Sequence, residues 1–164
     1  MKQWSRRTGM VVWGSAIVML VLAWVLSWFL TRPTAVRALW YVGWVFWVCG
    51  AVLIILPLIM IYGRARGKGW LDTMPIVDSG IYSLIRHPLF LGWQLMYVVV
   101  IFFGQHWIPL VMGIAGIACV YLISVQEDIR LAASLGDDYV RYMQKTPRMN
   151  ILLGLVRLLQ RRKK

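Results

Sequence analysis

Acidic residues are scarce in this sequence. Six Asp and Glu stand against 18 Lys and Arg, which gives a formal net charge of +12. All six acids lie beyond residue 70, and Glu127 is the only glutamate. A charge of this size raises the question of nucleic-acid binding, but no aromatic or motif pattern accompanies the basic tail. We therefore expect no nucleic-acid partner, and we expect the "RRKK" tail to contact anionic lipid.

Cysteine is also rare, and the chain has neither internal repeats nor a low-complexity linker. Cys49 and Cys119 both lie in apolar stretches, without metal-ligand spacing and without an obvious partner. They are expected to be small packing residues, so no metal site is predicted. The length of 164 residues and the lack of a linker predict a single domain, 1–164.

What the sequence does contain is long apolar runs. Hydrophobic residues make up 60% of the chain, and its mean hydropathy is +0.69. Backbone groups in lipid must be hydrogen-bonded within their own segment, so each long run predicts a helix. We predict an all-α, polytopic membrane protein with four transmembrane helices, at about 10–30, 38–62, 89–104 and 108–125. The last two are expected to form a tight hairpin, and residues 126–164 to form cytoplasmic and interfacial helices.

The positive charges are distributed unevenly around these runs. If the four spans alternate in direction, all Lys and Arg except Arg32 and Arg37 fall on one side of the membrane. This is the positive-inside bias, and it predicts a multi-pass integral membrane protein with both termini in the cytoplasm.

Turn and cap residues predict the helix boundaries after the fourth run. That helix is expected to continue to Gly136, and Asp137 is expected to cap the short helix that follows. Beyond Pro147 the apolar residues recur at helical spacing, which is typical of a helix lying in the headgroup plane. They are Ile151, Leu152, Leu155, Val156 and Leu159.

The stretch "GIYSLIRHPLFLGW" (80–93) carries polar residues directly before the third run. A residue before proline is pushed out of the α conformation, whereas proline suits the first helical position. A helix is therefore expected to start at Pro88, with His87 at its N-cap edge. Its free N–H groups, with Arg86 and Tyr82, form a corner that suits an anion. A plain helix start with an interfacial arginine and a solvated histidine explains the same residues equally well.

Glu127 and Asp128 lie at the cytoplasmic edge of the fourth run, antiparallel to the third. They can therefore approach Arg86 and His87. Two adjacent carboxylates can accept hydrogen bonds from a ribose or an ammonium group, and ionisable groups near membrane depth are usually paired or functional. A structural ion pair with Arg86 or Arg130 is the alternative, which the local sequence slightly favours.

Taken together, "GIYSLIRHPLFLGW" and "EDIRLAASLGDDYVRYMQKTPR" resemble the isoprenylcysteine carboxyl methyltransferase and phospholipid methyltransferase superfamily of integral membrane enzymes. The pattern of that superfamily is G-x-Y-x-x-x-R-H-P-x-Y-x-G, an acidic pair, then F-G-x-x-Y-x-x-Y and a proline. Both blocks occur here in this order, over about the last half of the chain. The resemblance implies methyl transfer from S-adenosyl-L-methionine, bound at the cytoplasmic face, to a lipophilic acceptor in the membrane.

The resemblance also implies which residues bind the cofactor. They are Met74, Pro75, Ile76, Val77, Tyr82, Arg86, His87, Pro88, Leu89, Phe90, Glu127 and Asp128. Phe90 stands where the pattern has tyrosine, Leu135 where it has phenylalanine, and Asp128 is one methylene shorter than the usual second acid. Ile123 stands where isoprenylcysteine enzymes carry the arginine that is expected to meet the substrate carboxylate. The resemblance therefore predicts the residues that bind the cofactor but does not identify the methyl acceptor. No catalytic residue is assigned.

Two other functions are compatible with the same residues. An NADPH-dependent membrane reductase of the sterol reductase type shares an R-H-P-like corner, but those chains are longer. Only Arg64, Arg66 and Lys68 are extra basic residues for a 2′-phosphate. The third possibility is a non-catalytic membrane protein that keeps the ligand pocket. The predicted partners are the membrane and a lipophilic small-molecule or lipid substrate, and no protein partner is evident.

Overall fold

Helices make up all the regular structure in the part of the chain that the computed structural model describes, residues 6–30, 36–65 and 79–162. In chain order they are α1 (Arg6–Leu30), α2 (Arg37–Ala65), the short 3-10 helix η1 (Gly80–Ser83), α3 (Pro88–Gly104), α4 (Trp107–Leu135), α5 (Asp137–Lys145) and α6 (Ile151–Arg162). The predicted all-α fold class is confirmed.

Three helices among the described residues are long and apolar enough to cross a membrane. The three segments are Thr8–Leu30, Arg37–Met60 and Trp107–Leu135. Their outward faces expose large apolar side chains, such as Trp28 and Phe29 at 78% each, which lipid would cover. α3 is shorter: its 17 residues span about 26 Å at 1.5 Å per residue. The chain is therefore a membrane protein with three candidate spans, where four were predicted.

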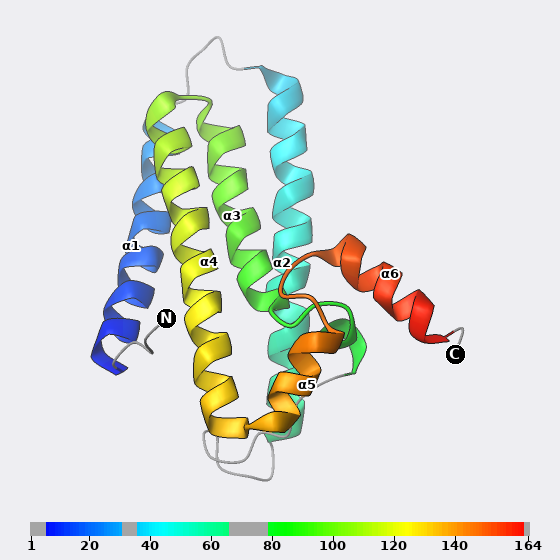
Figure 1. Cartoon of the computed structure of the whole chain (residues 1–164). Helices are drawn as coiled ribbons and strands as arrows, with labels where there is room; N and C mark the ends of the chain where they lie inside the picture. Colours follow the sequence, from blue (N-terminus) through cyan, green and yellow to red (C-terminus); the bar gives the residue numbers. More distant parts are fainter. Residues whose placement is uncertain (1–5, 31–35, 66–78, 163–164) are drawn as a thin grey trace.

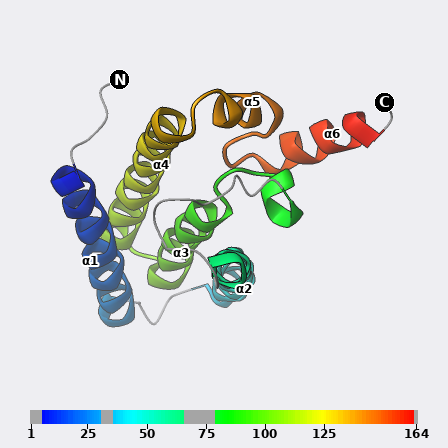
Figure 2. The same ribbon diagram turned by 90° about the horizontal axis from the view of Figure 1, so that it is seen from below.

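α3 lies at the centre of the bundle. α1, α2 and α4 pack around it, as the two views in Figures 1 and 2 show. Tyr97, Val99 and Val100 of α3 are completely buried. The hydroxyl of Tyr97 donates to the carbonyl oxygen of Ala16 in α1. The apolar side chains of α3 thus contact other helices, whereas most of the large apolar side chains of α1 and α2 face outward.

Glycines allow the close contacts of α3 with its neighbours. A Cβ atom on Gly116 of α4 would lie 2.1 Å from the ring of Tyr97, and one on Gly92 of α3 would lie 2.9 Å from the carbonyl oxygen of Gly50 in α2. Small residues commonly let membrane helices approach in this way. These contacts fix the height and the rotation of α3 relative to α4 and α2, and so they position the Pro88 end of α3.

The predicted helix boundaries are largely confirmed. α3 begins at Pro88 with His87 as its N-cap residue. α4 continues to Leu135, and Gly136 follows with a φ of 62°. The cap prediction for the next helix is wrong by one residue, because Gly136 is also the N-cap of α5 and Asp137 is its first residue. One left-handed glycine ends one helix and begins the next, so no side-chain cap is needed.

The segment between α5 and α6 returns the chain to the start of α3 (Figure 1). The backbone N–H groups of Arg86 and His87 donate to the carbonyl oxygens of Pro147 and Arg148, each over 3.0 Å. This pair of hydrogen bonds attaches the carboxy-terminal segment to the turn that holds the predicted site residues.

α6 follows from this attachment and extends away from the bundle (Figures 1 and 2). The side chain of Asn150 caps it by accepting a hydrogen bond from the N–H of Leu153 at 2.9 Å. Gly154 packs so closely on the backbone of Leu84 that a Cβ atom there would lie 2.0 Å from the carbonyl oxygen. The predicted helix after Pro147 is thus confirmed, and its contact with the turn before α3 depends on a glycine.

Candidate functional site

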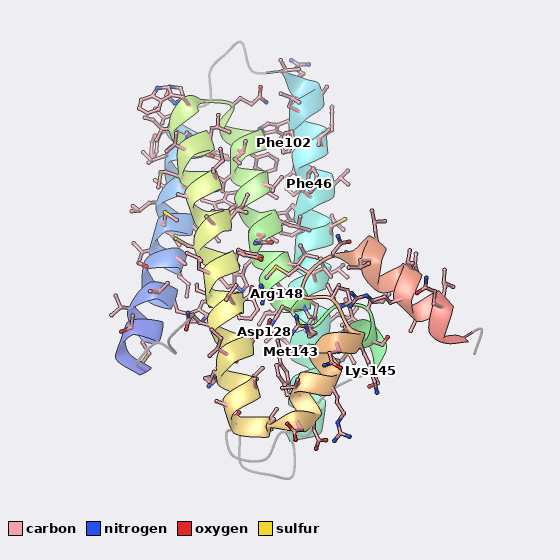
Figure 3. The ribbon with its side chains drawn as sticks, viewed as in Figure 1. Phe46, Phe102, Asp128, Met143, Lys145 and Arg148 are labelled. Atoms are coloured by element: carbon pink, nitrogen blue, oxygen red, sulfur yellow. The ribbon has the colours of Figure 1, made fainter. Side chains whose placement is uncertain are left out.

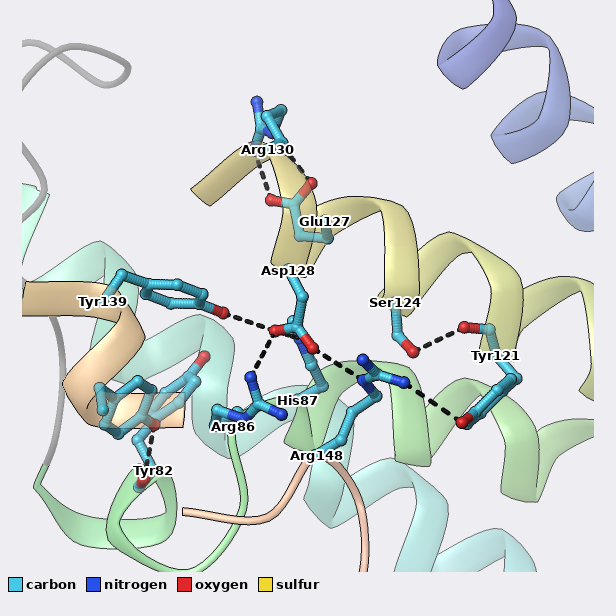
Figure 4. A network of polar contacts seen from close by, with 11 residues as sticks. Tyr82, Arg86, His87, Tyr121, Ser124, Glu127, Asp128, Arg130, Tyr139 and Arg148 are labelled. Atoms are coloured by element: carbon cyan, nitrogen blue, oxygen red, sulfur yellow. Dashed lines mark hydrogen bonds and ion pairs between the residues drawn. The ribbon is translucent and has the colours of Figure 1, made fainter. Parts of the chain in front are cut away.

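Asp128 is the centre of a buried polar cluster near the start of α3 and the end of α4 (Figures 3 and 4). Its Oδ1 atom accepts hydrogen bonds from Nη1 of Arg86 at 2.9 Å, Nε2 of His87 at 2.8 Å and the hydroxyl of Tyr139 at 2.7 Å. Its Oδ2 atom accepts from Nε of Arg148 at 2.7 Å. The Asp128 side chain is only 2% exposed.

Four hydrogen bonds reach the Asp128 carboxylate, three at Oδ1 and one at Oδ2. A carboxylate offers about four lone-pair sites, and every partner here is a donor. The ionised carboxylate and the two guanidinium groups stabilise one another, which offsets part of the cost of burying Asp128 and Arg86. Because the Asp128 side chain is only 2% exposed, a ligand cannot reach the carboxylate, and its role is to orient the side chains around it.

The protonation of the surrounding groups agrees with this arrangement. Burial raises the pKa of the Tyr139 hydroxyl, and the hydrogen bond to Asp128 and the charge of Asp128 raise it further. Burial also raises the pKa of Tyr82, to about 12. Burial by itself lowers the pKa of Arg148, but the hydrogen bond to Asp128 and its charge outweigh burial and raise that pKa. Both tyrosines are therefore neutral and Arg148 is charged at neutral pH.

Five of the predicted cofactor residues come together here. Arg86 and His87 both contact Asp128 directly, and Pro88 and Phe90 are buried in the first turn of α3. The rings of His87 and Phe90 meet edge to face with centroids 5.1 Å apart. Trp13 of α1 lies beyond Phe90, with centroids 5.3 Å apart. The histidine that precedes proline is thus held in the protein interior, between a carboxylate and an aromatic ring.

Glu127 points away from the cluster (Figure 4). Its Oε2 atom accepts a hydrogen bond from Nε of Arg130 at 3.0 Å, its Oε1 atom accepts from Nη2 of the same residue, and its side chain is 27% exposed. Consecutive residues of an α-helix point in directions about 100° apart, so the two acids cannot share a face. Of the predicted acidic pair, Asp128 contacts Arg86 and His87, and Glu127 is the accessible carboxylate.

The other predicted residues lie around this centre or outside the described part. The carbonyl oxygen of Tyr82 in η1 accepts a hydrogen bond from the hydroxyl of Tyr142 at 2.6 Å. Leu89 is half-buried in the first turn of α3. The remaining four lie in a range that the structure does not describe: Met74, Pro75, Ile76 and Val77.

Three residues of the cluster were not among the predicted site residues. Tyr139 and Arg148 both belong to the second sequence block, which was the signal that could have identified them. Arg148 also donates from Nη1 to the hydroxyl of Tyr121 at 3.2 Å, and its guanidinium carbon lies 5.5 Å from the centre of that ring. Tyr121 carries no sequence signal, because it is one aromatic residue within an apolar run.

A groove of about 630 Å³ opens beside the cluster. Its polar lining includes Arg86, Arg148 and Arg157, and its apolar lining includes Leu91 and Leu153. No acidic side chain is among the described residues that line it. A volume of this size lies in the range of small-molecule sites.

The second histidine and the two cysteines lie apart from this site. Nδ1 of His106 accepts a hydrogen bond from the N–H of Ile108 at 3.3 Å, at the start of α4. Cys49 and Cys119 are both free thiols. No group of three or more His, Cys, Asp or Glu with the geometry of a metal site occurs in the ranges that the structure describes.

The two blocks that resemble the methyltransferase superfamily meet in space at the cluster. The first block supplies Arg86 and His87, and the second supplies Asp128, Tyr139 and Arg148. The resemblance has no further support, because no protein-family model, curated protein or solved structure matches this chain.

Proposed function

We propose that this protein transfers a methyl group from S-adenosylmethionine to a lipophilic acceptor in the membrane. The observation that carries the proposal is that the two sequence blocks meet at Asp128. Asp128 of the second block contacts His87 of the first, and these two residues are 41 positions apart in the sequence. A functional family pattern should assemble into one site, whereas a chance pattern has no reason to. The proposed cofactor site is the cytoplasmic end of α3 and α4.

We further propose that α3 is a fourth membrane crossing, which forms a hairpin with α4 through Gln105 and His106. The 17 residues of α3 suffice because α1, α2 and α4 enclose it, so its short ends are not left to lipid. Four crossings put both termini on one side, and the distribution of Lys and Arg makes that side the cytoplasm. The Asp128 cluster then lies where a soluble cofactor can reach it.

The residues at this end fit the chemical groups of the cofactor. Pro88 has no N–H and that of His87 donates to Arg148, so the N–H groups of Leu89 and Phe90 are the ones without a partner within the helix. Together with Arg86 they suit a carboxylate. Glu127 is the accessible acceptor for ribose hydroxyls or an ammonium group, since its side chain is 27% exposed and that of Asp128 only 2%. The resemblance adds the segment 74–77 and Tyr82 to this site. The donors and the acceptor that the cofactor needs are therefore present on both helices.

When bound, S-adenosylmethionine supplies a methyl group on a positively charged sulfur, whose in-line displacement requires alignment and the exclusion of water. The residues of this chain contribute to the reaction by positioning the reacting groups. Asp128 holds His87 and Arg86 rigidly, and the packing of Phe90 on His87 and Trp13 keeps water from that side of the histidine. No side chain is assigned as an acid or a base.

An NADPH-dependent reductase is the second candidate, because the three arginines of the groove could meet nucleotide phosphates. Isothermal titration of the purified full-length protein with S-adenosylhomocysteine and with NADPH separates the two. We expect binding of the first. Tight binding of NADPH without binding of S-adenosylhomocysteine would overturn the methyltransferase proposal.

The site itself is tested by substitution. Glu127→Ala and His87→Ala should each weaken the binding of S-adenosylhomocysteine, whereas Asp138→Ala, in an exposed ion pair with Arg141, should not. Unchanged affinity in both site variants would refute the site. Labelled methyl transfer into extracted membrane lipids then tests for an acceptor.

A further inference from the structure

We infer that the groove beside the Asp128 cluster binds an acidic membrane lipid. The phosphate of this lipid lies among Arg86, Arg148 and Arg157, and an acyl chain follows the apolar lining. The inference goes beyond methyl transfer and is tested without the cofactor. The groove is formed by α3, α4 and the carboxy-terminal segment; it shares Arg86 with the proposed cofactor site, and Glu127 does not line it.

The first support is an excess of positive charge. Arg86 and Arg148 share a single carboxylate, Asp128, so these three groups together leave one positive charge. Arg157 adds another: its Nη1 donates to the carbonyl oxygen of Gln144 at 3.2 Å, and no ion pair joins it to an acid among the described residues. Two positive charges on one groove without an acidic lining complement a phosphate.

The second support is an unsatisfied donor. The side chain of Arg86 is only 8% exposed, and its Nη1 atom is already bound to Asp128. Its Nε atom is buried and has no hydrogen-bond partner in the described part of the chain. Buried donors are nearly always paired, because an unpaired one loses its hydration without compensation. Arg86 is part of the groove lining, so a small rotation of its side chain would bring Nε to an anion oxygen in the groove.

The third support is the apolar part of the lining. Leu91 of α3, Met149 and Leu153 line the same groove as the arginines. A free phosphate would engage the arginines and leave these side chains to water, whereas a phospholipid covers both. α6 borders the groove, and its residues Leu152 and Val156 are 77% and 49% exposed. An exposed apolar helix of this kind lies at the membrane surface, where lipid headgroups are.

Native mass spectrometry of the full-length protein in detergent tests this inference. The protein is titrated separately with phosphatidic acid, phosphatidylcholine and inorganic phosphate, without cofactor. We expect retention of phosphatidic acid at least about tenfold above phosphatidylcholine, and no retained inorganic phosphate. Equal retention of the two lipids would overturn the inference. If inorganic phosphate is retained as tightly as phosphatidic acid, the ligand of the groove is a free anion and not a lipid, which would also overturn the inference.

Two pairs of matched variants locate the site. Arg157→Gln should lower the retention of phosphatidic acid about tenfold, whereas Arg141→Gln removes the same charge from an exposed pair with Asp138 and should leave it unchanged. Leu153→Trp adds bulk in the groove and should also lower retention, whereas Leu152→Trp on the exposed face should not. Equal effects within both pairs would show that the lipid binds elsewhere. Because no cofactor is present, failure here leaves the titration with S-adenosylhomocysteine unaffected.

Discussion

The Nε2 atom of His87 lies 2.8 Å from Oδ1 of Asp128, and this contact joins the residue before α3 to the carboxy-terminal half of α4. Both side chains are buried, with exposures of 5% and 2%. The same carboxylate also pairs with Arg86 and Arg148. Breaking a buried charge network by removing one partner costs far more than breaking an exposed ion pair. Asp128 should therefore be the residue on which the stability of this end of the bundle depends.

Substitution Asp128→Asn tests that dependence. The amide keeps the shape but loses the charge that compensates two guanidinium groups, and it turns two N–H donors toward existing donors. We expect the free energy of unfolding to fall by about 3–5 kcal/mol. The measurement is denaturant or thermal unfolding of the protein in detergent.

Glu127→Gln is the matched control, one residue away on the same helix. Its ion pair with Arg130 is exposed, so we expect a loss below about 1 kcal/mol. Equal destabilisation by the two substitutions would contradict the central role of Asp128.

The contact between Tyr97 and Gly116 yields a second prediction. A Cβ atom at position 116 would lie 2.1 Å from a fully buried ring, so Gly116→Ala forces α3 and α4 apart. We expect it to destabilise the fold by about 1–3 kcal/mol. Gly14→Ala places the same methyl group where nothing lies within 4 Å, and it should be neutral or slightly stabilising. A thermal melt of both variants that shows the same shift would refute this packing.

The number of membrane crossings can be tested by determining on which side of the membrane each terminus lies. With α3 as a fourth crossing, both termini lie on the same side, whereas three crossings place them on opposite sides. We expect fluorescent-protein fusions at either end to fluoresce in the cytoplasm, and alkaline phosphatase fusions at either end to be inactive. An active phosphatase at one end alone would mean that α3 does not cross the membrane.

Tyr139 predicts a dependence of stability on alkaline pH. Its folded-state pKa is raised, so the folded protein holds this proton more tightly than the unfolded chain does. The stabilisation is complete below the unfolded pKa of about 10 and is lost as the pH rises towards the raised value. We expect the free energy of unfolding to fall more steeply above about pH 10 in the wild type than in Tyr139→Phe. Identical slopes in the wild type and Tyr139→Phe would contradict the role of Tyr139.

Local chemistry explains which features could be predicted from the sequence. Pro88 lacks an N–H and suits the first turn of a helix, and Gly136 tolerates a positive φ, so both mark helix ends within a single turn. The apolar runs predicted helices because lipid leaves backbone groups no other partner. Even the approach of Asp128 in the fourth run to Arg86 and His87 before the third followed from their antiparallel order.

Local chemistry could not predict how each helix is rotated about its axis or how deeply it is buried among the other helices. Hydropathy did not reveal that α3, the shortest of the four apolar helices of the bundle, is the one the others surround. It could not distinguish Glu127 from Asp128 either, since adjacent acids have the same composition and differ only in direction. Arg148 reaches Asp128 through the return of the chain after α5, for which no local signal exists.

The sequence by itself determined the all-helical class, the helix ends at Pro88 and Gly136, and the residues from which a polar site could be built. Only the tertiary structure decided that Asp128 receives four donors, that Glu127 stays accessible, and that three arginines line one groove. The reason is physical: helix ends depend on the residues of one turn, whereas the direction of a side chain depends on how glycines and large rings of different helices pack together.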